Sequence, residues 1–155
     1  MAWAVAFAAV LFSPWLVALS ASVASTQGDD NRYIRQVREQ LRRAGESLER
    51  QGFELAQSVY TGSLDDGESE SLTITLPFRT GGYRLVGVCD NDCDDLDLVF
   101  MNLYGETIAE DLEPDDLPVL MIASVGHTRY RLRVNMASCS SSPCWYGVGV
   151  FGRNR

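Results

Sequence analysis

The chain has 155 residues, of which 46% are hydrophobic and 22% charged, and its formal net charge is −8 at pH 7. This length suits one domain of ordinary size once a targeting segment is removed. The acidic balance disfavours binding to nucleic acid, whose phosphates need a basic face, and to anionic membrane surfaces. It favours cations or basic partners.

The N-terminal segment predicts export. Residues 1–19 are almost wholly apolar, and Ser22-Val23-Ala24 fits the small residues that signal peptidase reads. We therefore predict a signal peptide over residues 1–24, a secreted or periplasmic protein, and no stable membrane insertion after cleavage. The segment lacks Lys and Arg, so an uncleaved membrane anchor is the alternative; the short apolar run and Pro14 count against it.

Residues 25–52 predict one amphipathic helix that ends at Gly52. Its apolar residues recur at a three-to-four spacing: Ile34, Val37, Leu41, Ala44 and Leu48. One interpretation is a helix that packs on the domain that follows. The other is a short coiled coil that makes a homo-oligomer or docks to a partner.

After Gly52 the hydrophobic period changes from 3.6 to 2, so residues 53–155 predict an all-β domain. The expected strands cover residues 53–64, 71–76, 83–89, 96–102, 107–110, 118–123, 129–136 and 146–150. About eight short strands between Gly-, Asp- and Pro-rich turns indicate an antiparallel β-sandwich or jelly roll.

The four cysteines form two close pairs, Cys89/Cys93 and Cys139/Cys144. An even number of cysteines in an exported chain predicts two disulfides. Three pairings are possible, and pairing within each close pair is the simplest. A zinc site built from all four cysteines is the alternative.

An acidic segment follows Val88 and encloses the first cysteine pair. Its aspartates are Asp90, Asp92, Asp94, Asp95 and Asp97. Because Ca²⁺ takes six to eight oxygen ligands, largely carboxylates, these residues are candidate ligands for it. A second acidic segment, residues 111–116, could face the first across one end of the sandwich. The alternative is that the acids only solvate exposed turns.

Two further groups are candidate ligand surfaces. Arg129, Arg131 and Arg133 alternate with apolar residues and should line one strand face, where they could bind an anionic ligand, face solvent, or pair with acids on a neighbouring strand. Trp145 is out of phase with Tyr146, so it could face outward and stack on a sugar or a partner. It could also pack on the second cysteine pair or under the helix.

The sequence predicts no enzyme. It holds a single histidine, His127, and no Gly-x-Ser-x-Gly, P-loop or Rossmann pattern. A hydrolase that uses two carboxylates is the least favoured alternative, because nothing singles out a pair.

Residues 62–152 resemble the bacterial pre-peptidase C-terminal (PPC) domain. The resemblance is carried by Gly62-Ser63-Leu64, Leu72-Thr73-Ile74-Thr75-Leu76, Gly82-Tyr83, Asp95-Leu96-Asp97-Leu98, Gly105 and Tyr130-Arg131-Leu132-Arg133-Val134. It implies a secreted jelly roll that accompanies exported peptidases and binds rather than catalyses, and some relatives bind calcium. The two cysteine pairs and the helix depart from that family.

Together these features predict an exported, non-catalytic binding module for a protein or glycan ligand, with Ca²⁺ as a candidate cofactor. The alternative is a structural or assembly protein of the cell envelope that uses the N-terminal helix.

Overall fold

A computed structural model describes residues 27–123 and 128–154. The predicted signal peptide, residues 1–24, and His127 lie outside these ranges. Within them, no helix is both long enough and apolar enough to cross a membrane.

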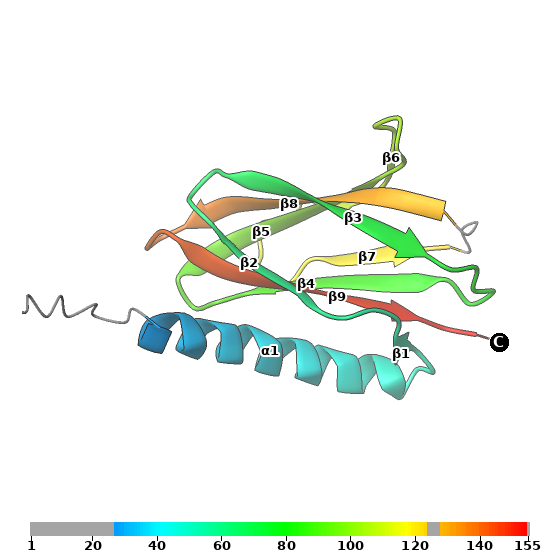
Figure 1. The fold of residues 1–155 in the computed structure, drawn as a ribbon, viewed down its shortest axis with the longest axis horizontal. Helices are drawn as coiled ribbons and strands as arrows, with labels where there is room; N and C mark the ends of the chain where they lie inside the picture. The colour runs from blue at the N-terminus through cyan, green and yellow to red at the C-terminus, as the bar shows by residue number, and fades with distance from the viewer. Residues whose placement is uncertain (1–26, 124–127, 155) are drawn as a thin grey trace, which may run out of the picture.

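Over the described residues, one helix precedes nine strands (Figure 1). In chain order they are α1 (Gln27–Glu49), β1 (Glu54–Leu55), β2 (Tyr60–Leu64), β3 (Ser69–Leu76), β4 (Tyr83–Cys89), β5 (Cys93–Met101), β6 (Thr107–Asp111), β7 (Val119–Ile122), β8 (Thr128–Cys139) and β9 (Cys144–Gly152).

The strands form two antiparallel sheets that stack as a sandwich (Figure 1). One sheet has the order β1-β9-β4-β7, with β2 also paired to β9, and the other has the order β3-β8-β5-β6. For β2 to β9 this alternation between two sheets is the strand order of a jelly roll. The predicted all-β sandwich preceded by a helix is confirmed.

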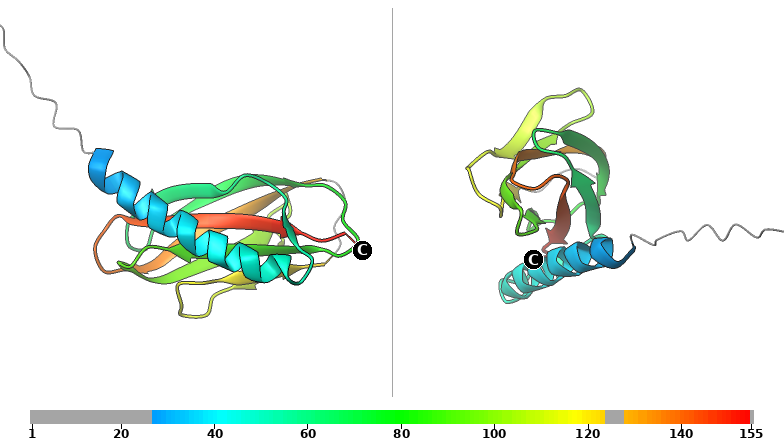
Figure 2. Two further views of the ribbon diagram at one scale, coloured as in Figure 1. Left: turned by 90° about the horizontal axis from the view of Figure 1, so that it is seen from below. Right: turned by 90° about the vertical axis from the view of Figure 1, so that its left-hand side faces the viewer.

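The core lies between the sheets, and strand alternation decides which residues enter it. In β8, Tyr130, Leu132 and Val134 are buried while the arginines between them are exposed. In contrast, β4 and β9 are buried almost throughout, because α1 covers their outer faces. Figure 2 shows the helix lying across this sheet.

Glycines in β9 allow α1 to approach closely. Val37 and Leu41 are 0% and 3% exposed, and they join a second apolar cluster with Val86, Val88 and Phe151. A Cβ atom on Gly147 would lie 2.4 Å from Cγ1 of Val37. The apolar stripe of the helix is therefore used to pack on the sandwich, the first of the two expected interpretations.

The expectation of one strand over residues 53–64 is wrong. The segment forms β1 and β2, which both pair with β9 and are separated by residues 56–59. The Gln57 side chain donates a hydrogen bond to the carbonyl of Thr75 in the opposite sheet and accepts one from Tyr60 Oη at 2.8 Å. Residues 56–59 lie opposite only residues 149–150 of β9, so β1 and β2 do not continue one another in a single register.

Candidate functional site

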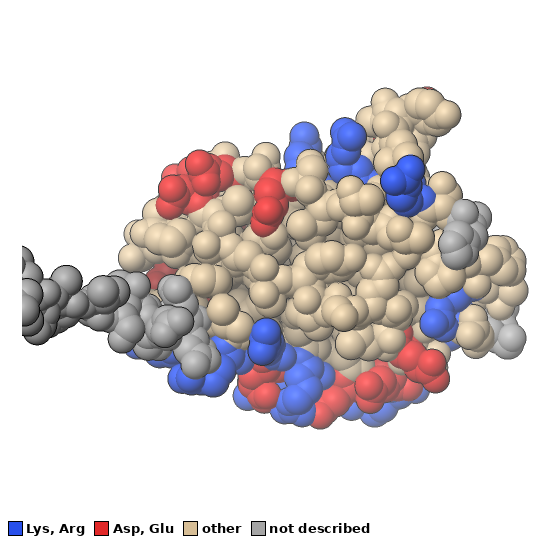
Figure 3. Space-filling view, in the orientation of Figure 1, with Lys and Arg blue, Asp and Glu red and all other residues tan. Residues whose placement is uncertain are grey.

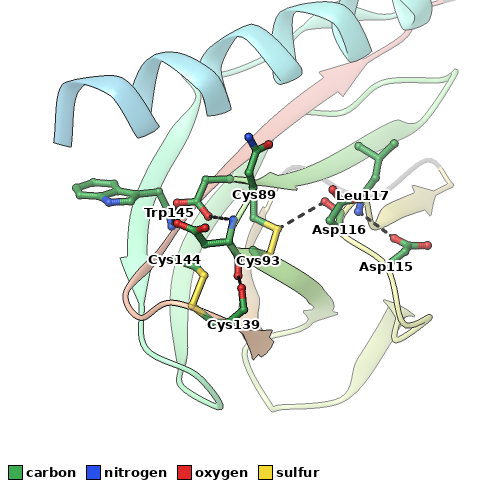
Figure 4. Close-up of a disulfide and its surroundings, with 12 residues drawn as sticks. Cys89, Cys93, Asp115, Asp116, Leu117, Cys139, Cys144 and Trp145 are labelled. Atoms are coloured by element: carbon green, nitrogen blue, oxygen red, sulfur yellow. Dashed lines mark hydrogen bonds between the residues drawn. A yellow bond between two sulfur atoms is a disulfide. The ribbon is translucent and has the colours of Figure 1, made fainter. Parts of the chain in front are cut away.

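Two local disulfides stand at one end of the sandwich (Figure 4). Cys89 pairs with Cys93 and Cys139 with Cys144, which confirms the predicted disulfides and the simplest pairing. Cys93 also lies opposite Cys139 in the β5–β8 register, so the two bridges are neighbours. All four cysteines are in disulfides, so none is left as a thiolate to bind zinc, and the zinc alternative is wrong.

Asp90 is a structural carboxylate inside this end. It is 1% exposed, and its two oxygens accept hydrogen bonds from the backbone N–H groups of Asp92 at 3.3 Å and Trp145 at 2.9 Å. Burial raises its pKa above the ordinary value, although these backbone donors act in the opposite direction. Asp90 therefore ties the first disulfide loop to the start of β9.

The second acidic segment lies against the first, as the sequence led us to expect. The backbone N–H of Leu96 donates to the carbonyl of Asp115 at 2.9 Å. Cys89 Sγ lies 3.8 Å from the carbonyl oxygen of Asp116 (Figure 4). The carboxylate of Asp115 accepts the N–H of Leu117 at 2.9 Å. Asp95 and Asp115, which are distant in sequence, therefore lie close to one another.

We call this region the acidic end. Asp95, Asp97 and Asp115 lie close enough for their charges to interact, and Asp92, Asp94 and Asp116, which flank them in the chain, complete it. Oδ1 of Asp95 is buried and has no hydrogen-bond partner within the described residues. Its pKa is raised by burial first, and then by the neighbouring carboxylates of Asp97 and Asp115. Asp97 accepts a hydrogen bond from the amide of Asn135 at 2.7 Å. The acidic end therefore holds charges that repel one another.

The structure describes no assembled metal site. Within residues 27–123 and 128–154, no three His, Cys, Asp or Glu side chains are arranged to hold a metal ion. Of the predicted ligands, Asp90 is occupied by backbone donors, whereas Asp94 is exposed and Asp92 half-buried. Calcium binding by Asp90, Asp92, Asp94, Asp95 and Asp97 stays a prediction.

Arg129, Arg131 and Arg133 lie exposed on the outer face of β8. They stand opposite Thr75, Thr73 and Ser71 of β3, respectively. Figure 3 shows positive side chains gathered over β3 and β8. Ion pairs within the described residues are confined to α1, so the expected pairing of these arginines with acids on a neighbouring strand is not found there.

Trp145 is half-buried and packs against the apolar cluster beneath α1. Its backbone N–H is the donor held by Asp90. Of the expected alternatives, the structure shows packing under the helix, and a ligand contact by the exposed part of Trp145 stays a prediction.

Sequence reasoning missed a groove of about 580 Å³ between α1 and the β1–β2 segment. Leu41, Val59 and Phe151 contribute apolar lining, and the charged rim includes Arg42. Arg42 bonds Glu39 and Glu46, and the guanidinium lowers the pKa of Glu39 to about 2. The one available sequence signal is Gly45 inside the helix, where an added Cβ would lie 3.1 Å from the Phe151 ring.

Comparisons with known proteins place the chain in no family. No family model matches it, and no curated protein matches it. Among solved structures it is similar to PliG of Aeromonas hydrophila, a periplasmic inhibitor of g-type lysozyme, with 11% identity and a TM-score of 0.39. The match covers 60% of this chain and 84% of that one. Similarity at this level supports no inference about function, and the PPC resemblance stays a prediction.

Proposed function

We propose that this protein is an exported, non-catalytic binding module whose acidic end binds a basic protein surface. The carrying observation is the junction of two acidic segments through the hydrogen bond from Leu96 N–H to Asp115 O. The neighbouring disulfides support export, because such bonds persist in the periplasm and outside the cell.

Charge supports a cationic partner. Asp95 keeps an unpartnered buried oxygen within the described residues, and its neighbours Asp97 and Asp115 raise its pKa. A nearby cation relieves this repulsion, speeds association and selects against acidic partners. A neutral glycan gives no such relief, so we favour a protein over a glycan ligand.

Calcium is the second part of the proposal. Ca²⁺ bound beside Asp95 and Asp97 would compensate the same carboxylates, with Asp92 of the disulfide loop and Asp94 at the start of β5 supplying further oxygens. The ion would then be a structural cofactor that sets the charge of the acidic end.

The envelope-assembly alternative has less support. Val37 and Leu41 are covered by the sheet, so docking through α1 would use its charged outer face. Whether the protein forms homo-oligomers stays a prediction, which sedimentation equilibrium of the oxidised protein would test.

A titration of the ¹⁵N-labelled oxidised protein tests the proposal. CaCl₂ and a hexa-arginine peptide are added separately, and MgCl₂ serves as the ion control. We expect chemical shift changes at residues 90–97 and 111–116, which the Asp95→Asn/Asp97→Asn variant loses. The matched control is Glu49→Gln/Glu54→Gln, which removes two exposed acids elsewhere and changes the net charge equally.

The two parts fail separately. If the protein responds to hexa-arginine but not to CaCl₂, only the calcium part of the proposal is ruled out. Shifts spread over the surface, or lost equally in both variants, would show that binding follows net charge alone and would overturn the acidic end as a site.

A further inference from the structure

The outer face of β8 carries three arginines in a row on a protein whose net charge is −8. Arg129, Arg131 and Arg133 are exposed, and none makes an ion pair with any residue that the structure describes. Acids are plentiful in the chain, yet the facing positions of β3 are Ser71, Thr73 and Thr75. The row is therefore positive and uncompensated along that side.

The three arginines have different neighbours on the two strands beside β8. On one side lie the hydroxyls of β3, and on the other lie Val99 and Met101 of β5, opposite Arg133 and Arg131. Val99 faces away from the core but is only 3% exposed, so long side chains of the neighbouring strands must cover it. We call this strip of hydroxyls, arginines and apolar side chains the arginine face.

The arginine face has a defined end. The residue that continues the row is Asn135, whose amide donates to Asp97 at 2.7 Å. The positive row therefore stops after three residues and meets a carboxylate, which would repel a longer anionic chain. The face fits a short ligand with about three anionic groups.

Spacing identifies the ligand. Alternate residues of a strand are about 7 Å apart, so the three guanidinium groups leave the sheet at that repeat. An extended peptide has the same repeat between its alternate side chains. Carboxylates at positions i, i+2 and i+4 would each meet one guanidinium, which binds a carboxylate through two parallel hydrogen bonds.

We propose that the arginine face binds an extended acidic peptide that lies along β8, with Asp or Glu at three alternate positions. Flanking Ser71, Thr73 and Thr75 hydroxyls donate further hydrogen bonds to the same carboxylates. This surface adjoins the acidic end at Asp97 but takes a ligand of the opposite charge, so the proposal does not depend on the proposed function.

Fluorescence anisotropy with two labelled peptides tests the register. One peptide, Thr-Glu-Thr-Glu-Thr-Glu-Thr, carries Glu at alternate positions. The other, Thr-Thr-Glu-Glu-Glu-Thr-Thr, has the same composition and charge in a block. Exposed Arg–carboxylate pairs contribute little each, so we expect the alternating peptide to bind about tenfold more tightly than the block peptide at low salt.

Two triple variants locate the site. Arg129→Gln/Arg131→Gln/Arg133→Gln should lose the tenfold preference for the alternating peptide. The control, Arg35→Gln/Arg38→Gln/Arg50→Gln, removes three exposed arginines of α1 and its end, changes the net charge equally, and should keep the preference. Unchanged circular dichroism spectra show that both variants are folded.

Three results would overturn the proposal. Equal affinity for the two peptides would mean that binding does not depend on the spacing of the arginines along β8. Equal loss in the two variants would mean that overall charge drives binding. Absence of binding at millimolar peptide and low salt would mean that the arginine face is only a solvated surface.

Discussion

The carboxylate of Asp90 has a structural role. Its oxygens hold the backbone N–H groups of Asp92 and Trp145, and its own position is almost closed to solvent. If the acceptor is removed, the buried N–H groups stay desolvated without a partner. The resulting loss of stability is larger than the net contribution of the hydrogen bonds themselves.

Asp90→Ala should therefore lower the free energy of unfolding by about 2–4 kcal/mol, since two backbone donors lose their acceptor. Urea denaturation of the oxidised protein measures the change. Asp94→Ala is the control, because Asp94 is exposed nearby at the start of β5, and it should change stability by no more than about 0.5 kcal/mol. Equal effects would mean that Asp90 has no special structural role.

The raised pKa of Asp95 makes the free energy of unfolding depend on pH. Its pKa is raised in the folded state, chiefly by burial and then by Asp97 and Asp115. The folded protein thus binds this proton more tightly than the unfolded chain does. The contribution to stability is present below the unfolded pKa, about 3.9, and is lost as the pH rises through the folded pKa.

Asp95→Asn should consequently raise the free energy of unfolding at pH 7, and the gain should disappear at pH 3. Urea denaturation in EGTA at the two pH values measures both effects. If the variant is less stable than the wild type at pH 7 without metal, the repulsion among these carboxylates is not a cost to the fold.

The sequence could predict that acids cluster at one end, but not what each acid does. The segment from Asp90 to Asp97 is dense in aspartate, and that density is visible without a structure. Which of them faces inward depends on how the Cys89–Cys93 loop turns and on the contact with β9, which are tertiary facts. The sequence therefore predicts Asp90 as a ligand, whereas in the structure its oxygens accept hydrogen bonds from backbone N–H groups.

At the scale of elements, α1 and β9 fit together because β9 lacks side chains where the helix crosses it. A Cβ on Gly147 would meet Cγ1 of Val37 at 2.4 Å and Cδ1 of Leu41 at 2.9 Å. Overpacking of this kind typically costs about 1–3 kcal/mol.

Gly147→Ala should destabilise the protein by about that amount, as measured by urea denaturation. In a double-mutant cycle, Val37→Ala removes the nearer of the two clashing atoms and leaves Cδ1 of Leu41, so Gly147→Ala should cost less in that background. Additive effects of the two substitutions would contradict the close contact between α1 and β9.

The elements differ in how far their sequence predicts them. In β8 the strict alternation of Arg with Tyr130, Leu132 and Val134 marks a strand with one wet face, and it forms one. In β4 the residues from Leu85 to Cys89 are buried on both faces of the strand. Their sequence has no alternation of polar and apolar residues, so it does not indicate which element covers the outer face. The helix over β4 and β9 could be expected to pack somewhere, but its place on this sheet comes from tertiary packing.

At the scale of the whole molecule, the two disulfides act at the same end of the sandwich. Each closes a loop of only a few residues, which constrains the unfolded chain by about 2 kcal/mol. Cys93 and Cys139 face each other in the β5–β8 register, so the bridges should stabilise a shared structure.

We expect Cys89→Ser/Cys93→Ser and Cys139→Ser/Cys144→Ser each to lower the free energy of unfolding by about 2 kcal/mol or more. Removal of both bridges should give a loss that differs from the sum, because neighbouring sites couple. Thermal or urea denaturation of the three variants measures this. Strict additivity would show that the two bridges act independently.

The packing of α1 on β9 also has a consequence for the order of folding. The helix leaves the ribosome before any strand, whereas β9 is made after all the others. Until β9 is in place, Val37 and Leu41 have no complete surface to cover them. A chain that is still incomplete at its C-terminus would therefore carry an exposed apolar stripe until the last strand is in place.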